Sequence, residues 1–465
     1  MKKMKINAVN LGKPSEYINK TSRDYSIYVC KNRGIPSIGD GLKDGQRKAL
    51  YVLRNKKGEI KTISHAGDMI SSNLYLHGDI PAAESIGMLA APYLNNLPLI
   101  DGIGTFGTAV SPYGIAAPRY TYVTKNKATE LLVYADLEII PLVDNYDGTT
   151  KEPKHFLPLI PLVLLNGVKG MGVGYATNIF PRKLSGIINA VCSVLSGTDI
   201  NDEDLTPVYE YCSSGVSKSL GVNKWEFYGT VKIIDTSTLV VSSLPPGLTR
   251  EKFIETLIGL EESDKIREYI DETAENINVT IKLPRGTAKD WSEYDAIEYL
   301  KLYTRDTENL VVIDWSGDIK PYSEPAQLVI DFVNTRIGYF KDRYNRLLSI
   351  ENSKLTLNKL LLCCMKNDIA GEMKNLKNKK SVVQFITDLA TNNSLNPTAD
   401  QIDYCATLPL YRWAVDEIAA VEDAINENNK QINEYISILG SDRKIKNIYK
   451  KEVQYLMTQK FNTNR

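Results

Sequence analysis

Apolar residues recur at helical spacing along the last third of the chain, in two stretches long enough to form extended helices. The first stretch covers 325–365 and the second covers about 411–439. Apolar positions of the first are Leu328, Phe332, Ile337, Phe340, Leu347, Ile350, Leu357 and Leu361. Two long helices on either side of a short helical region are typical of an antiparallel coiled coil with a globular tip. We therefore predict a coiled-coil domain over 326–440 and a C-terminal tail over 441–465.

The middle of the chain shows strand-like patterning. β-branched and apolar residues alternate over 226–248 and 276–284, and helical spacing follows each stretch, at 250–260 and 291–303. Strands that alternate with helices predict an α/β domain, which we assign to 141–325. The chain as a whole is predicted to be a mixed α/β multidomain protein, as its length of 465 residues allows.

The N-terminal part has the pattern of short helices followed by a glycine-rich hairpin. Residues 43–54 place apolar side chains on a basic helix, and 65–92 have the pattern of two short helices, with Asp79 suited to cap the second. Residues 101–125 are rich in glycine and then alternate, as a hairpin or wing does. Two helices joined by a tight turn and followed by a wing predict a winged-helix domain, which we assign to 23–140.

Charge is balanced over the whole chain but unevenly distributed along it. There are 56 Lys and Arg and 56 Asp and Glu, so the formal net charge is zero. Residues 1–130 carry 18 basic and 10 acidic side chains, whereas 201–330 carry 13 basic and 24 acidic ones. An overall charge of zero therefore does not argue against nucleic-acid binding, and the basic N-terminal third indicates a module that faces a polyanion.

The composition points to the cytoplasm. Residues 1–22 are polar, lack the apolar segment of a secretory signal and are predicted to be a flexible arm. The apolar stretch at 157–165 is interrupted by Pro158 and Pro161 and is too short to span a membrane. The six cysteines show no Cys-x-x-Cys spacing and only three histidines are present, so neither a zinc site nor a disulfide framework is indicated.

The most informative short motif is Ala116-Ala117-Pro118-Arg119-Tyr120-Thr121. The phenol of a tyrosine can attack a phosphodiester and conserve its energy in a phosphotyrosine bond. A neighbouring arginine offers a fork of donors to phosphate oxygens, where negative charge develops. Alone the hexamer is weak evidence, because the chain contains 27 tyrosines and an Arg-Tyr pair at a strand end is usually structural.

Other motifs surround the hexamer in a definite order. They are Asn32–Pro36, Asp40–Tyr51, His77-Gly78-Asp79, Gly102–Thr108, Leu164–Gly174 and Ala176–Ile179. Together, over roughly 23–185, they resemble the DNA-cleaving subunit of type IIA topoisomerases, such as gyrase A and the topoisomerase IV cleavage subunit. The segment 242–245 resembles the family's tower segment. The short chain resembles the medium subunit of T-even-type phage topoisomerases more than a bacterial subunit.

The resemblance implies an enzyme, the breakage–reunion subunit of an ATP-dependent type II topoisomerase. Such an isomerase cleaves both DNA strands through 5′-phosphotyrosine links, passes a second duplex and reseals the break. The family's architecture implies a winged-helix cleavage domain over 23–140 and an α/β tower over 141–325. It also implies that the coiled coil over 326–440 carries a helical exit gate at which two chains dimerise.

Carried over residue by residue, the resemblance makes Tyr120 the nucleophile and Arg119 its catalytic arginine. A second tyrosine two residues later is a rival, but the family's tyrosine directly follows the arginine. Arg33 aligns with an arginine near the scissile phosphate. His77 aligns with the second histidine of a family motif whose first histidine is replaced here by Tyr75.

Four further residues are predicted to contact DNA: Lys43, Arg47, Lys48 and Met171. The three basic residues align with, or lie beside, the family's DNA-contacting helix, whereas a solvated helix face is the alternative. Met171 stands where the family has an isoleucine that wedges between base pairs, and its alternative is a core position. An apolar wedge is effective because the bent duplex contacts more protein, which offsets the cost of unstacking. Asp40 and Asp44 are expected to cap or to pair with the basic residues and not to bind metal.

The chain is predicted to be catalytically incomplete by itself. Phosphoryl transfer of this kind needs a metal ion, yet the N-terminal region shows no acidic cluster set among strands and no Walker loop is present. The resemblance implies an ATPase/TOPRIM large subunit that binds ATP and, with the DNA, holds Mg²⁺. We therefore assign no metal- or cofactor-binding residue here, and expect a homodimer on double-stranded DNA. The expected location is the cytoplasm, or the host nucleoid for a phage protein.

Two other functions stay open from the residues alone. A non-catalytic winged-helix DNA binder with a coiled-coil dimeriser predicts DNA binding without covalent adducts. A helical scaffold that uses the acidic middle of the chain as a protein interface predicts no salt-dependent DNA binding.

Overall fold

The computed structural model describes residues 14–212, 217–372, 376, 378–409, 413 and 417–462. These form two compact units. The first contains the described residues up to Arg336 and from Lys450 onward, and the second is Ile337–Tyr449. Helices and strands both contribute to the first unit, which confirms the mixed α/β class predicted from the pattern.

The first unit begins with two consecutive helices. Helix α1 (Pro14–Val29) leads directly into η1 (Cys30–Gly34), a short π-helix. The flexible arm expected over 1–22 is therefore wrong for 14–22, which lies in α1, and 1–13 fall outside the described residues. The basic helix expected over 43–54 is α2 (Asp44–Leu53), whose apolar side chains are buried.

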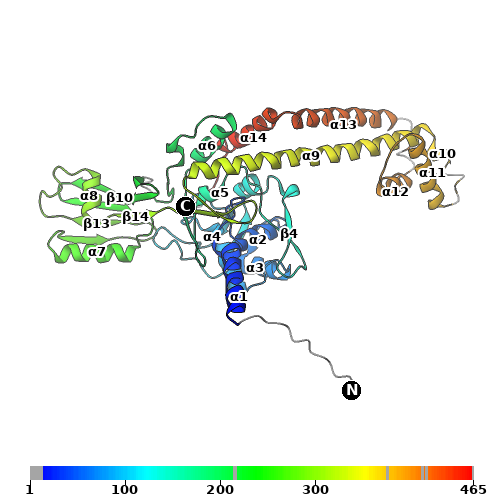
Figure 1. Cartoon of the computed structure of the whole chain (residues 1–465). Coiled ribbons are helices and arrows are strands. Elements are labelled where there is room, and N and C mark those ends of the chain that lie inside the picture. The colour runs from blue at the N-terminus through cyan, green and yellow to red at the C-terminus, as the bar shows by residue number, and fades with distance from the viewer. Residues whose placement is uncertain are drawn as a thin grey trace, which may run out of the picture. The chain divides into compact units, whose positions relative to one another are not determined.

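The two short helices and the wing-like hairpin are also present. Helices α3 (Thr62–Ser71) and α4 (Asp79–Ala90) pack with α2 (Figure 1). Gly78 is the N-cap of α4, so Asp79 is an acidic residue of the first turn and not the cap that we expected. An antiparallel three-stranded sheet completes this part, in the order β1 (Ile60–Lys61), β3 (Tyr122–Lys125) and β2 (Ile100–Ile103).

The segment that follows packs back on the N-terminal helices. The Phe156 backbone N–H donates to the Asp40 carboxylate at 3.0 Å, across more than a hundred residues. The elements of this segment are η2 (Thr129–Val133), η3 (Leu137–Ile139), β4 (Leu142–Asp144), β5 (Lys151–Pro153), α5 (Leu162–Asn166), β6 (Val168–Met171), β7 (Ala176–Ile179), α6 (Leu184–Ser196) and η4 (Asp202–Leu205).

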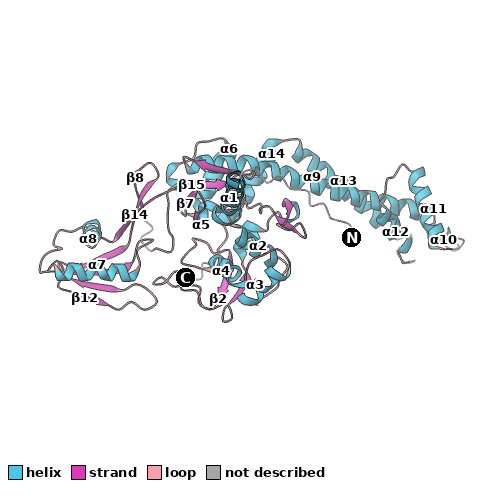
Figure 2. Cartoon of the chain, turned by 60° about the horizontal axis from the view of Figure 1, so that its bottom comes forward, coloured by secondary structure: helices cyan, strands magenta, loops and turns pink. Residues whose placement is uncertain are grey.

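A separate α/β core is formed by residues between Tyr228 and Leu302. This range is shorter than the α/β domain that we predicted over 141–325. Its four-stranded antiparallel sheet has the order β10-β11-β13-β12, and α7 and α8 pack with it (Figures 1 and 2). A second sheet has the order β14-β9-β8. The bounds are β8 (Ser217–Gly221), β9 (Lys224–Tyr228), β10 (Thr230–Asp235), β11 (Thr238–Ser243), α7 (Arg250–Glu262), β12 (Glu268–Asp271), β13 (Val279–Lys282), α8 (Glu293–Tyr299) and β14 (Tyr303–Thr307).

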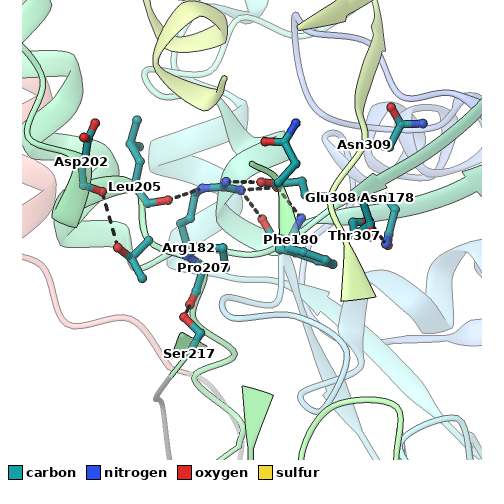
Figure 3. Close-up of polar contacts among 12 residues, drawn as sticks. Asn178, Phe180, Arg182, Asp202, Leu205, Pro207, Ser217, Thr307, Glu308 and Asn309 are labelled. Atoms are coloured by element: carbon teal, nitrogen blue, oxygen red, sulfur yellow. Dashed lines mark hydrogen bonds and ion pairs between the residues drawn. The ribbon is translucent and has the colours of Figure 1, made fainter. Parts of the chain in front are cut away.

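A buried ion pair joins two distant segments of the first unit. The Arg182 guanidinium donates to both carboxylate oxygens of Glu308, at 2.8 and 2.7 Å, and to the carbonyl oxygens of Phe180 and Leu205 (Figure 3). Glu308 directly follows β14 and precedes the hairpin of β15 (Leu310–Ile313) and β16 (Ile319–Tyr322). This pair therefore holds the segment after β7 against the segment between β14 and β15.

The second unit is helical. Helix α9 (Pro325–Lys366) runs from the first unit into the second, and α13 (Glu417–Leu439) lies antiparallel to it (Figure 1). Two contacts show the direction: Asn358 with Asn428, and Lys366 with Glu422. Lys341, nearer the start of α9, pairs with Asp442, which lies just beyond the end of α13. The shorter helices are α10 (Ile369–Glu372), α11 (Lys379–Asn392) and α12 (Ala399–Thr407).

The C-terminal tail expected over 441–465 is wrong for most of its length. Residues 442–457 form α14 (Asp442–Met457), and its buried side chains recur at helical spacing. They are Ile445, Tyr449, Val453 and Leu456. The last residues, 463–465, lie outside the described part of the chain.

Candidate functional site

Arg33 and His77 meet side chain to side chain, although 44 residues separate them. Arg33 is on η1, and His77 is in the turn that joins α3 to α4. The Arg33 Nη2 atom lies 3.0 Å from Nε2 and 3.3 Å from Nδ1 of His77. Since an arginine N–H can only donate, the imidazole must offer a lone pair, which a neutral ring has and an imidazolium lacks.

The surroundings of His77 favour this neutral form. Burial lowers the pKa of His77, and the positive charges of Arg33 and Lys48 lower it further, while Asp44 opposes them. The ring of Tyr75 packs edge-on against the imidazole, with ring centroids 5.2 Å apart. His77 is therefore a neutral, oriented group beside an exposed guanidinium.

Lys43 lies at the N-cap of α2 and reaches a segment far along the chain. Its ammonium Nζ donates to the Lys169 carbonyl oxygen of β6 at 2.9 Å. Burial lowers the pKa of Lys43. The contact leaves donors of this ammonium available, because an ammonium carries three.

The side chains of Arg47 and Lys48 are buried, whereas the DNA contact that we predicted requires exposed charge. The Arg47 guanidinium is only 8% exposed and donates to both Asp40 carboxylate oxygens, at 2.6 and 3.0 Å. Lys48 is about as buried, with Nζ 3.0 Å from carboxylates of Asp44 and Glu152. The expected pairing with Asp40 and Asp44 is thus confirmed, and these ion pairs hold α2 in place instead of offering charge to a phosphate.

Met171 is at the end of β6, and its side chain is 83% exposed. The core alternative is therefore wrong for this residue. Glycines permit the position: an added Cβ on Gly170 would lie 1.9 Å from the Gly34 carbonyl oxygen, and one on Gly172 would lie 2.5 Å from the Cys30 sulfur. The β6–β7 hairpin thus lies directly on η1 and exposes an apolar side chain at its end.

Tyr120 and Arg119 lie in the turn just before β3, and both are exposed. The Arg119 guanidinium carbon is 4.8 Å from the centroid of the Tyr120 ring. Tyr120 is 67% exposed, and none of the residues that the structure describes hydrogen bonds to its hydroxyl. The rival, Tyr122, belongs to β3, where it pairs with Lys61 and Ile103. Of these two tyrosines, Tyr120 is the one that combines an exposed phenol with a flanking arginine.

A cleft of about 900 Å³ joins several of these residues. Arg33, Lys43 and His77 line it, whereas Arg119 and Tyr120 do not. Sequence reasoning missed several of its other charged or aromatic lining residues, among them Tyr28 and Arg305. Tyr28 could have been noticed from the sequence, because it lies close to Arg33, and the Arg33 guanidinium is 5.9 Å from the centroid of its ring. Nothing near Arg305 in the sequence indicates that this residue lines the cleft.

Arg305 is held in the cleft by a buried carboxylate. Its Nε donates to Glu226 at 2.5 Å, and Glu226 also accepts from the Tyr228 hydroxyl at 2.8 Å. The Arg305 side chain itself is largely exposed. A guanidinium fixed through Nε can turn its two terminal nitrogens toward an anion.

Within the described residues, no group of three or more His, Cys, Asp or Glu side chains is arranged to hold a metal ion. Among the same residues, no helix is both long and apolar enough to cross a membrane.

The fold of this chain is shared with a solved structure. The structure superposes on the topoisomerase II DNA-binding, cleavage and re-ligation domain of Plasmodium falciparum with a TM-score of 0.76. The match covers 96% of this chain and 66% of that one, at 21% sequence identity, so it shows a shared fold.

The sequence comparisons give the family. The family model for the A subunit of DNA gyrase/topoisomerase IV matches residues 33–454. The DNA topoisomerase medium subunit of Enterobacteria phage T4 is 26% identical over 439 residues, which are 90% of this chain and 97% of that protein. DNA topoisomerase 2 of Saccharomyces cerevisiae is 30% identical over 343 residues, 71% of this chain. The matched part is 24% of that eukaryotic relative.

The chain therefore belongs to the family of DNA gyrase/topoisomerase IV A subunits, and DNA breakage and reunion is the function that this membership gives it. It is thereby a type II topoisomerase subunit, as the resemblance of its motifs implied.

Proposed function

We propose that Tyr120 is the nucleophile with which this chain cleaves DNA, in an ATP-dependent type II topoisomerase. The observation that supports the assignment is the exposed Tyr120 phenol beside Arg119, with Tyr122 held in a strand. The Tyr120 oxygen forms a bond to phosphorus, and the bond from phosphorus to the 3′ oxygen breaks. The 5′ end stays on the tyrosine, and the 3′ oxygen leaves as a hydroxyl, so that the proton lost by the phenol balances the one gained by the 3′ oxygen. Religation is the reverse reaction, so bond energy is conserved.

The arginines stabilise the charge that grows on the phosphate during this exchange. Arg119 adjoins the nucleophile, and Arg33 offers the guanidinium that His77 orients in the cleft. Charge-assisted donors aimed at a developing charge supply a large share of catalysis in phosphoryl transfer. Removing one such donor costs about 10²–10³ in rate.

Magnesium and ATP are proposed to come with a partner subunit. The proposal rests on the family resemblance, in which a partner subunit supplies the metal-binding acids. A bound Mg²⁺ would supply neutralisation of charge on the scissile phosphate. We infer that an ATPase/TOPRIM large subunit, together with the DNA, holds it, and that the subunit name of the phage T4 relative reflects such an assembly.

Two copies of the chain are proposed to share each cleavage site. Tyr120 is not among the residues that line the cleft with Arg33 and His77, and we infer that a second copy brings the nucleophile to them. Mixing a Tyr120→Phe chain with a His77→Ala chain tests this arrangement. In mixed dimers one site is intact and the other doubly altered, so nicked DNA is expected; no nicking would contradict sharing between copies.

The architecture assigns the remaining steps. We propose that the helices α2–α4 with β1–β3 act as a winged helix that grips the duplex, with Met171 as the wedge and Lys43 as a phosphate contact. The α/β core acts as the tower, and the antiparallel α9 and α13 form a coiled coil that ends in an exit gate. A second duplex passes through the break and leaves at that gate.

Plasmid DNA tests the proposal as a whole. With the large subunit, Mg²⁺ and ATP, the chain is expected to change plasmid topology, and detergent is expected to trap protein covalently on the DNA. Tyr120→Phe should abolish the adduct, and the matched variant Tyr122→Phe should keep it. Salt-dependent binding with no adduct from the unaltered chain would favour the non-catalytic DNA binder instead.

A further inference from the structure

We propose that Tyr75 is a positioning residue for DNA cleavage, which acts by fixing the ring of His77 against Arg33. The proposal rests on the proposed function, because His77 and Arg33 are assigned to the cleavage site there. No direct contact between Tyr75 and DNA is needed for it.

Tyr75 is buried and packs directly against the imidazole of His77. The residue is 7% exposed, and its backbone N–H donates to the Met69 carbonyl oxygen of α3 at 3.1 Å. The interplanar angle to the His77 imidazole is 85°, with the centroids 5.2 Å apart. Edge-to-face contacts of this kind have a preferred geometry and so restrict rotation of the smaller ring.

The Tyr75 ring is also fixed by a second element. An added Cβ on Gly45 would lie 3.4 Å from the Tyr75 Cε2 atom, so α2 approaches the ring closely enough to limit its displacement. The Tyr75 ring thus packs against His77 and has α2 close to its edge. A smaller side chain there would leave the imidazole without this support.

Arg33 supplies the other contact of the imidazole. Its Nη2 atom is within 3.3 Å of both ring nitrogens of His77. The imidazole is therefore held by a guanidinium and a phenol ring, and its orientation determines where the guanidinium points. Because misplacement of a catalytic group by about 1 Å can cost 10²-fold in rate, loss of one of the two supports should be measurable.

The pKa of His77 depends on its burial and on the charged groups around it, so a titration of His77 reports on the same packing. The groups that act on it are Arg33 of η1 and Lys48 and Asp44 of α2, together with its burial. Tyr75 contributes to that burial. Removing the ring admits water, so the pKa of His77 should move up toward its ordinary value and the acidic limb of the cleavage rate should shift to higher pH.

The test is a double-variant cycle on the full chain with its large subunit. Tyr75→Leu should slow adduct formation by about tenfold, and Tyr75→Phe should leave the rate unchanged, because the ring is kept. In a His77→Ala background, Tyr75→Leu should have no further effect. Equal slowing in both backgrounds would overturn the proposal, as would slowing by Tyr75→Phe equal to that of Tyr75→Leu.

Two measurements separate this outcome from misfolding and from failure of the proposed function. Tyr134→Leu is the matched control, since Tyr134 is a buried tyrosine of the same unit, and its hydroxyl bonds to the Leu50 carbonyl oxygen. It should lower the melting temperature without moving the pH profile. NMR titration of ¹³C-labelled histidine, with only three histidines present, should show a raised pKa of His77 in Tyr75→Leu. An unchanged pKa of His77 would overturn the proposal even if no cleavage is observed.

Discussion

Replacing Glu308 by Gln removes one charge from a fully buried ion pair. The side chains of Arg182 and Glu308 are 0% and 2% exposed. The carboxylate accepts two hydrogen bonds from the guanidinium and a third, at 3.0 Å, from the Phe180 backbone. Gln keeps a single acceptor oxygen and turns an amide N–H₂ toward other donors, so a buried guanidinium is left without its counter-charge.

The expected cost follows from that burial. Breaking a buried pair by removal of one partner destabilises by about 3–5 kcal/mol, because the remaining charge is uncompensated. For a unit of this size the melting temperature should fall by about 4–7 °C, since the entropy of unfolding is about 2.1 cal/mol/K per residue. Calorimetry of the purified chain measures it. Replacing both residues by apolar ones, as Arg182→Met with Glu308→Leu, should cost less than Glu308→Gln alone.

An exposed ion pair provides the control. Lys151 and Asp144 approach to 2.7 Å, but their side chains are 61% and 64% exposed. Asp144→Asn should therefore cost about 0–1 kcal/mol. The reasoning from burial would be refuted by a Glu308→Gln variant as stable as Asp144→Asn.

Three further changes have expected outcomes. Gly170→Ala should displace the β6–β7 hairpin and reduce DNA bending in an energy-transfer assay; unaltered bending would contradict the close approach of this hairpin to η1. Arg305→Gln should weaken DNA binding and flatten the slope of log affinity against log salt by about 0.9, and an unchanged slope would exclude a phosphate contact. Burial lowers the pKa of His65 and His155 to about 4. Because their unfolded pKa is near 6.5, the unfolded chain binds more protons, so stability should be complete above pH 6.5 and fall toward pH 4, as urea unfolding can check.

The long helices and the strands of the α/β core were the parts of the fold most easily predicted from the sequence. The 3.6-residue spacing predicts α9 and α13, and alternation predicts the strands of the α/β core. The same spacing is present in α14, where Ile445, Tyr449 and Val453 are buried, but we predicted a tail for the short segment that follows the expected exit gate. A polar, amphipathic helix needs its packing partner to be recognised, and that partner is not adjacent in sequence.

In the candidate site, too, the sequence does not show which distant residues a charged side chain contacts. Arg33 and His77 could be predicted from their motifs, and the structure brings them together. Arg47 and Lys48 have a composition that fits a DNA-binding face equally well. Their ion-pair partners include Glu152, about a hundred residues away, and only the folded chain shows that these charges are already neutralised.

The identity of the covalently bound tyrosine tests the central claim most directly. Adducts trapped on plasmid DNA can be digested with nuclease and protease, and the nucleotide-bearing peptide can be sequenced by mass spectrometry. The account predicts a nucleotide on Tyr120, joined through its 5′ phosphate. A nucleotide on Tyr122, or on any other residue, would contradict the assignment of the nucleophile.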